Sequence, residues 1–108
     1  MYYYTMTTYK PDQRLKNLVS AFQQLSSEDD YIAFLRDLLT EPEMSEFSGR
    51  FAVAQALAAG KSQRAVAAET GISIATVTRV NQWLLRGMNG YKTVIDRLNK
   101  QHHHHKAD

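Results

Sequence analysis

The sequence predicts an all-α protein, and three features of its 108 residues predict this class. Apolar residues recur at spacings of three and four from residue 15 onwards, as on one face of a helix. Asp, Ser and Thr, which commonly start helices, precede these periodic segments. No segment alternates apolar and polar residues as a half-buried strand does. The length suits one domain, but a helical subunit this small buries only about two thirds of its surface, so dimerisation would enlarge its core.

The N-terminal half is expected to hold an arm and the start of a helical domain that spans residues 12–100. Residues 1–11, MYYYTMTTYKP, lack helical periodicity and end at a proline, so we expect an arm there. The first helix is predicted from Asp12 and the second after Ser26 and Ser27. The second has apolar residues over an arc that needs more cover than one small subunit offers: Tyr31, Ile32, Phe34, Leu35, Leu38 and Leu39.

Three further helices are predicted after a long central one. Thr40 and Glu43 match a capping box that begins the central helix, and Gly60 is expected to end it. Ser62 and Ser73 are the expected N-caps of two short helices that flank a turn at Gly71. The stretch RGMNG precedes a last helix, YKTVIDRLNKQ, with Tyr91, Val94, Ile95 and Leu98 facing inward. Residues 101–108 are expected to be a histidine-containing tail, either native or a purification remnant.

Charge is distributed unevenly along the chain. Residues 28–46 carry seven Asp or Glu and one Arg, whereas residues 47–108 carry nine Lys or Arg and three Asp or Glu. A basic half beside an acidic middle indicates that one region meets a polyanion while the other faces water or a cationic partner. Ordinary solvated charge is the alternative interpretation.

Several function classes are disfavoured by what the sequence lacks. There is no cysteine, so disulfides, thiolate metal sites and cysteine nucleophiles are excluded. Every histidine lies in the run His102–His105, so no catalytic triad or metal site can be assembled from the helical domain, and we expect no enzyme. No segment resembles a signal peptide or reaches the roughly 20 apolar residues of a membrane span, so we expect a cytoplasmic protein with no membrane partner.

Residues 63–82, QRAVAAETGISIATVTRVNQ, satisfy the packing constraints of a helix-turn-helix in one frame. The motif needs a small residue midway along its first helix, a residue tolerant of positive φ in the turn, and apolar residues where the helices pack. With Gln63 counted as first, positions five, nine, ten, fifteen and eighteen are Ala67, Gly71, Ile72, Val77 and Val80. The sequence therefore predicts a helix-turn-helix over residues 62–85; a tight helical corner without that function is the alternative.

A helix-turn-helix places its second helix in the major groove of DNA, with the N-terminal residues against base edges. Exposed Ile74 and Ala75 suit the methyl groups of thymine. The residues expected on this DNA-facing side are Ser73, Ile74, Ala75, Thr76, Thr78 and Arg79. The start of the first helix suits the phosphate backbone, through Lys61, Ser62, Gln63 and Arg64. The expected partner is double-stranded DNA, bound with sequence specificity.

Residues 38–82, LLTEPEMSEFSGRFAVAQALAAGKSQRAVAAETGISIATVTRVNQ, resemble the Trp repressor family. In that family a threonine-proline helix start, an arginine on the central helix, S-Q-R and I-A-T-[IV]-T-R recur in this order. The tail RVNQWLLRGMNGYKTVIDRL looks more like the uncharacterised YerC/YecD branch. The resemblance implies a six-helix subunit in an interlocked homodimer, where the first two helices of one chain pack on the central helices of the other. It also implies a repressor that reads a palindromic operator through residues 73–85.

The resemblance also bears on a small-molecule effector. In tryptophan-binding members two arginines sandwich the indole, and their counterparts are Arg50 and Arg79, with Thr40 at the pocket rim. Two departures argue against tryptophan as corepressor. Val80 stands where the family has a glycine that leaves room for the ligand, and Trp83 where it has a serine that helps hold the ligand's amino group. We expect no cofactor; ion pairing or phosphate contact is the alternative role of the two arginines.

Two other functions stay open at this point. One is a dimeric protein-interaction module whose helix-turn-helix packs on a protein partner, and the other is a repressor that senses a small molecule such as an amino acid. The sequence names neither the operator nor the regulated genes, and it does not separate a repressor from an activator.

Overall fold

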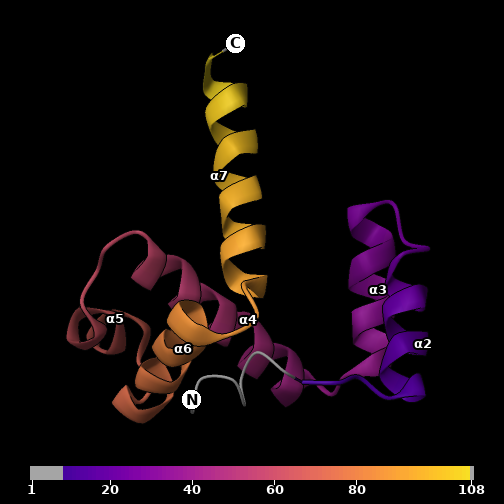
Figure 1. Cartoon of the computed structure of the whole chain (residues 1–108), viewed down its shortest axis with the longest axis horizontal. Helices are drawn as coiled ribbons and strands as arrows, with labels where there is room; N and C mark the ends of the chain where they lie inside the picture. Colours follow the sequence, from indigo (N-terminus) through magenta and orange to yellow (C-terminus); the bar gives the residue numbers. More distant parts are fainter. Residues whose placement is uncertain (1–8, 108) are drawn as a thin grey trace. The chain divides into compact units, whose positions relative to one another are not determined.

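A computed structural model of the chain describes residues 9–107, with side chains described as far as residue 101. Six helices and no strand cover these described residues, which confirms the predicted all-α class (Figure 1). The chain divides into two compact units, residues 8–47 and residues 48–108, called here the N-terminal unit and the C-terminal unit. Helix α4 runs through the boundary between them.

The N-terminal unit begins with α2 (Gln13–Phe22) and α3 (Glu28–Leu38), which start near the predicted positions and are each capped by a side chain. A side-chain oxygen of Asp12 accepts a hydrogen bond from the backbone N–H of Leu15 at 2.8 Å, and Ser27 accepts one from Asp30 at 3.1 Å. These bonds satisfy N–H groups that the first turn of a helix leaves without partners. The rings of Phe22 and Phe34 meet edge to face with centroids 5.4 Å apart, which joins the two helices.

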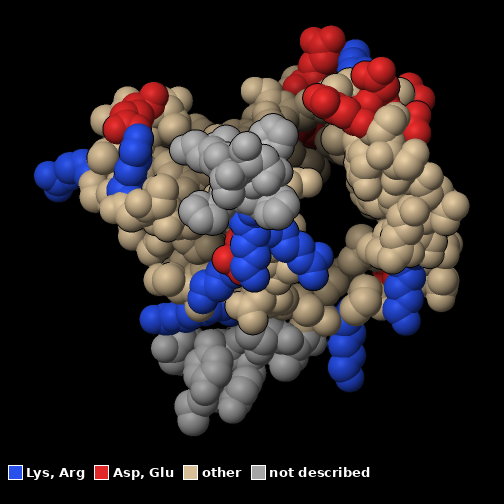
Figure 2. Space-filling model, turned by 90° about the horizontal axis from the view of Figure 1, so that it is seen from above, with Lys and Arg blue, Asp and Glu red and all other residues tan. Residues whose placement is uncertain are grey.

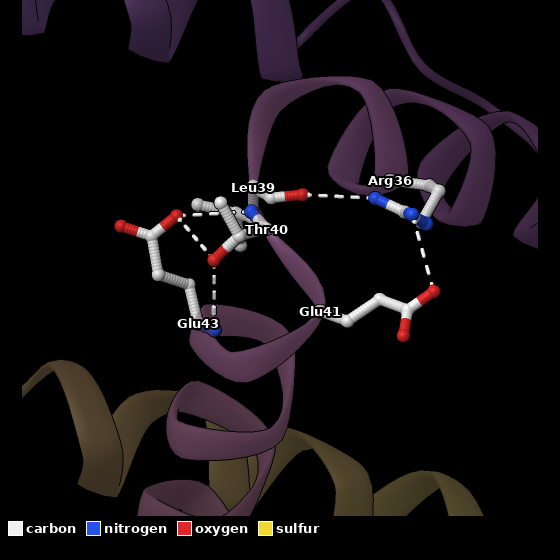
Figure 3. Close-up of polar contacts among 5 residues, drawn as sticks. All are labelled: Arg36, Leu39, Thr40, Glu41 and Glu43. Carbon is white, nitrogen blue, oxygen red and sulfur yellow. Dashed lines mark hydrogen bonds and ion pairs between the residues drawn. The ribbon is translucent and has the colours of Figure 1, made fainter.

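The corner between α3 and α4 (Glu41–Ala58) is held by hydrogen bonds on both sides of the chain (Figure 3). Thr40 Oγ1 accepts from the backbone N–H of Glu43 at 3.2 Å, and Glu43 Oε1 accepts from the backbone N–H of Thr40 at 2.9 Å. This reciprocal pair is the predicted capping box. On the other side, Arg36 donates to the carbonyl of Leu39 at 3.3 Å and pairs with Glu41 at 3.2 Å.

The capping box lowers the pKa of Glu43 below its ordinary value. The larger cause is the hydrogen bond from the backbone N–H of Thr40, followed by the bond from the Thr40 hydroxyl, at 3.1 Å. Both donors favour the ionised carboxylate. The charge also lies in the first turn of α4, where the helix dipole favours an anion.

Helix α4 ends where the sequence predicts. Gly60 has a φ of +101°, and its N–H donates to the carbonyl of Leu57 at 3.0 Å. The N–H of Lys61 donates to the carbonyl of Ala56 at 3.2 Å. The two bonds together form a Schellman motif, which requires the left-handed backbone that glycine adopts without steric cost.

The C-terminal unit continues with α5 (Gln63–Thr70), α6 (Ile74–Arg86) and α7 (Gly90–Ala107). Phe51 on α4 and Tyr91 on α7 bring their rings to 6.4 Å between centroids. Among the residues whose side chains are described, the buried core lies wholly in this unit and consists of Val53, Ala54, Val66, Val77, Val80, Leu84 and Ile95.

The last helix differs from the sequence prediction in two respects. Val94 and Leu98 were predicted to face inward but are 48% and 41% exposed, because among the α7 side chains described, up to residue 101, only Tyr91 and Ile95 reach the core. The helix also continues to Ala107, past the predicted segment YKTVIDRLNKQ, since backbone hydrogen bonds prolong a helix without an apolar period. The arm expected at residues 1–11 lies outside the described residues except for residues 9–11.

No helix within residues 9–107 has the length and apolar content that crossing a membrane requires.

Candidate nucleic-acid interface

The turn between α5 and α6 is fixed by its own polar groups. Thr70 Oγ1 donates to the carbonyl of Val66 at 2.7 Å and accepts from the N–H of Ile72 at 3.1 Å. Gly71 between them has a φ of +76°, the left-handed conformation that the sequence predicts for this position. Because one hydroxyl bonds to both sides of the turn, the angle between α5 and α6 is defined locally.

The pair of helices is also fixed to α4 by its apolar face. Val77 and Val80 on α6 are 0% and 2% exposed, and they belong to the same core as Val66 on α5. At the turn, a Cβ added at Gly49 of α4 would lie 3.3 Å from Cδ1 of Ile72, so a larger residue there would press against the turn. This packing rigidly supports the opposite face of α6.

The opposite face of α6 exposes most of the residues predicted to read DNA. Ile74 is 53% exposed, and Ala75, Thr78 and Arg79 are exposed as well. These side chains are therefore accessible to a partner. The face combines methyl groups, a hydroxyl and a guanidinium, which are the group types that contact base edges and phosphates.

Ser73 and Thr76 have a structural role at the start of α6. Ser73 Oγ accepts from the backbone N–H of Thr76 at 3.2 Å and donates to Thr76 Oγ1 at 3.1 Å. Ser73 is therefore the N-cap that the sequence predicts. Thr76 is half-buried, and its hydroxyl oxygen accepts the hydrogen bond from Ser73.

The starts of α5 and α6 are joined by a hydrogen bond that sequence patterns do not reveal. Thr78 Oγ1 donates to Gln63 Oε1 at 2.8 Å, although the two residues are 15 positions apart. Gln63 was predicted to face phosphate and Thr78 to face a base. The structure brings these two side chains into direct contact.

The remaining residues at the start of α5 differ in their partners. Ser62 Oγ accepts from the N–H of Ala65 at 3.1 Å and caps the helix. Lys61 pairs with Glu69 at 2.7 Å, with both side chains about half exposed (50% and 54%). A pair this exposed contributes little stability, so Lys61 can exchange its partner for a phosphate at small cost. Arg64 is exposed and makes no ion pair within the described residues.

Charge separates the two units. Acidic residues occupy the first turns of α3 and α4 in the N-terminal unit, and Figure 2 shows acidic side chains gathered at its upper right. Between residues 48 and 101 the C-terminal unit carries eight Lys or Arg and two Asp or Glu. A polyanion is therefore attracted to the unit that holds α5 and α6.

The residues of the expected effector pocket belong to both units. Val80 points into the core, whereas its neighbour Arg79 is exposed and Trp83, one turn later, is 44% exposed. Arg50 lies exposed on α4 in the same unit. Thr40 belongs to the N-terminal unit, where the capping box engages its hydroxyl. The space that a glycine would leave at position 80 is thus filled by a valine side chain.

The C-terminal unit contains an open groove that no sequence pattern predicts. The groove has a volume of about 760 Å³ and lies between the end of α4, α6 and α7. Its apolar lining includes Leu57, Leu84, Leu85 and Ile95, and its polar lining includes Asn81. The lining residues come from three helices and extend in sequence from Leu57 to Asn99, so helical periodicity alone does not group them.

Comparisons with known proteins agree on one family. The family model of the Trp repressor protein matches residues 13–99. The chain is 30% identical over 86 residues to the uncharacterised protein YerC of Bacillus subtilis (strain 168), which covers 80% of this chain and 83% of that protein.

Two solved structures share the fold. One is a TrpR-like protein from Eubacterium eligens ATCC 27750, with a TM-score of 0.76 and 35% identity over 82% of this chain and 91% of that one. The other is provisionally described as a Trp repressor, from Staphylococcus aureus, with a TM-score of 0.77 and 30% identity over 82% of this chain and 89% of that one.

Proposed function

The chain belongs to the Trp repressor family, and on that premise we propose that it is a sequence-specific DNA-binding transcriptional regulator that acts as a repressor. The family is regulatory rather than enzymatic. The proposal assigns double-stranded DNA as the partner and α6 as the helix that enters the major groove.

One observation carries this proposal: α6 has two faces with opposite characters. Val77, Val80 and Leu84 fix one face in the core, while Ile74 and Thr78 stand exposed on the other. A rigid helix with exposed methyl and hydroxyl groups at its N-terminal end suits direct readout of base edges. The positive charge of the C-terminal unit supports the same assignment.

The residues that we propose for DNA divide into two groups. Base edges are assigned to the start of α6 and phosphates to the start of α5 and to Arg79, because a fixed helix N-terminus and cationic side chains suit phosphate oxygens. The base group consists of Ser73, Ile74, Ala75, Thr76 and Thr78, and the phosphate group of Lys61, Ser62, Gln63, Arg64 and Arg79.

We further propose that the protein reads a palindromic operator as a homodimer. Neither α2 nor α3 contains a buried residue, and Ile32 on α3 is 52% exposed. The C-terminal unit also exposes apolar side chains, with Leu85 at 60% and Met88 at 58%. The acidic N-terminal unit of one copy is complementary in charge to the basic C-terminal unit of a second copy. A second copy of this chain therefore suits these surfaces.

Selection of bound fragments from genomic DNA, followed by a salt titration on the selected sequence, tests the function. We expect one palindromic sequence and an affinity that falls by about a thousandfold between 50 and 200 mM salt, as for a protein with several phosphate contacts. Ala75→Asp places a carboxylate against the DNA and should abolish binding. Ala68→Asp adds the same charge near the end of α5, on another exposed alanine, and should leave binding nearly intact.

The outcomes also separate the other functions. Fragments without a common sequence, bound equally by wild type and Ala75→Asp, would overturn the proposal and favour a protein partner for α6. A selected sequence that binds only in the presence of a small molecule would instead identify a sensing repressor.

A further inference from the structure

The hydrogen bond between Thr78 and Gln63 restricts what each side chain can offer to DNA. A threonine hydroxyl has one O–H donor and two acceptor lone pairs. Thr78 uses its donor on Gln63 Oε1, at 2.8 Å. What remains on the exposed side of Thr78 is an acceptor oxygen and a methyl group, with no donor.

Gln63 is restricted in the complementary way. Its carboxamide has one oxygen acceptor and an NH₂ group with two donors. Because Oε1 faces Thr78, the NH₂ group is the end left for another partner. Gln63 is the first residue of α5, where the helix dipole and the neighbouring N–H groups favour an anion. A phosphate oxygen therefore suits the NH₂ group of Gln63.

We propose that Gln63 is a positioning residue that sets the hydrogen-bond polarity of Thr78 and so helps to determine base specificity. This inference rests on the proposed function. With its donor held by Gln63, Thr78 accepts from an exocyclic amino group, N6 of adenine or N4 of cytosine, at one base position. It rejects guanine there, because guanine presents only the acceptors N7 and O6 in the major groove.

A second threonine on the same helix shows the opposite arrangement. Thr76 Oγ1 accepts from Ser73 Oγ at 3.1 Å, so the Thr76 hydroxyl keeps its own O–H free to donate. Two threonines separated by one residue thus present opposite polarities, each set by a neighbour. Only Thr78 depends on Gln63, so a change at Gln63 should alter one base position and not the other.

The test uses substitutions that separate the two roles of Gln63. Gln63→Glu keeps an acceptor for the Thr78 hydroxyl but replaces the NH₂ donors with a carboxylate that repels phosphate. Gln63→Ala removes both. Thr78→Val keeps the shape and the methyl group without the hydroxyl. Gln82→Ala, at an exposed glutamine later on α6, is the matched control. Each protein is titrated with four operators that differ only at the base facing Thr78.

We expect wild type to prefer adenine or cytosine over guanine by roughly fivefold or more, the usual cost of one mismatched base pair. Gln63→Glu should bind every operator more weakly and keep this preference. Gln63→Ala and Thr78→Val should reduce the preference to about twofold or less, while Gln82→Ala should match wild type. Equal preferences in Gln63→Ala and wild type would overturn the proposal, as would loss of the preference in Gln63→Glu.

A measurement without DNA distinguishes this failure from failure of the proposed function. Urea unfolding of wild type, Gln63→Ala, Thr78→Val and the double variant forms a mutant cycle for the bond itself. If these residues couple in stability but wild type selects no sequence, the proposed function fails and this inference fails with it. If wild type selects a sequence but the base preference ignores Gln63, only the positioning role is wrong.

Discussion

The two units of the chain use similar local signals but reach different degrees of burial. In the N-terminal unit, α2 and α3 are well capped and joined by Phe22 and Phe34, yet neither helix buries a residue. In the C-terminal unit, α4, α5, α6 and α7 all contribute to one core. Good caps and helical periodicity thus define where helices form, whereas burial depends on what packs against them. The contrast agrees with our proposals that the C-terminal unit contacts DNA and that a second copy of this chain covers the apolar face of the N-terminal unit.

The largest expected effect concerns the apolar face of α3. Ile32→Lys should convert the dimer to a monomer and abolish binding to a palindromic operator, because a buried unpaired ammonium is strongly unfavourable. Ala33→Lys is the control, since it adds the same charge one residue away, between Asp29 and Asp37 at helical spacing. Sedimentation at low micromolar concentration measures both. A wild-type chain that sediments as a folded monomer would contradict the dimer.

The second prediction compares the same substitution in both units. Val77→Ala should lower the free energy of unfolding by about 2 to 3 kcal/mol, because Val77 is fully buried. Val19→Ala on α2 should cost at most about 1 kcal/mol, because Val19 is 48% exposed. Urea denaturation gives both values. Equal losses of unfolding free energy in the two variants would contradict the expected difference between the units. They would mean that a second copy covers Val19 as completely as the core covers Val77.

The third prediction assigns DNA contact to one unit. Arg64→Ala should weaken binding to all sequences alike and reduce the slope of affinity against salt by about one, as for a lost phosphate contact. Arg14→Ala on α2 removes the same charge from the N-terminal unit and should leave the slope unchanged. Thr78→Ala should instead relax the preference at one base position. Uniform losses from Arg64→Ala and Thr78→Ala would contradict their separate roles.

The fourth prediction concerns the acidic corner of the N-terminal unit. Hydrogen bonds from Thr40 lower the pKa of Glu43 from 4.5, so the capping box stabilises the fold above the ordinary pKa. This contribution should disappear as the pH falls through the lowered pKa, where the carboxylate takes up a proton in the folded chain. Glu43→Gln should therefore be less stable than wild type at pH 6 and approach wild type at acidic pH. A difference that is independent of pH would refute the role of the charge.

The smallest expected effect is that of free tryptophan. Val80 is 2% exposed and already packs α6 against the core, so the position of α6 should not depend on a ligand. Calorimetry with tryptophan should show no heat, and operator affinity should be the same with and without it. A gain of tenfold or more, about 1.4 kcal/mol of coupling, would show that Arg50 and Arg79 still form a working pocket.

The sequence by itself determined the helix boundaries in most places. Ser62 and Ser73 are N-caps as predicted, α2 and α3 begin near the predicted starts at Asp12 and Ser27, and Gly71 has the predicted positive φ. These features are readable because each depends on atoms within about three residues along the chain. The end of the last helix was not readable in this way, since α7 continues to Ala107, past the predicted segment YKTVIDRLNKQ, without apolar periodicity.

Only the tertiary structure decided which surfaces meet. The contact of Thr78 with Gln63 and the pairing of Lys61 with Glu69 join residues on different sides of a turn. Helical periodicity marked the apolar faces of α3 and α6 alike, but only α6 has its face in the core. The physical reason is that apolar spacing records a capacity for burial, whereas burial itself requires a matching surface from elsewhere in the fold or from a second chain.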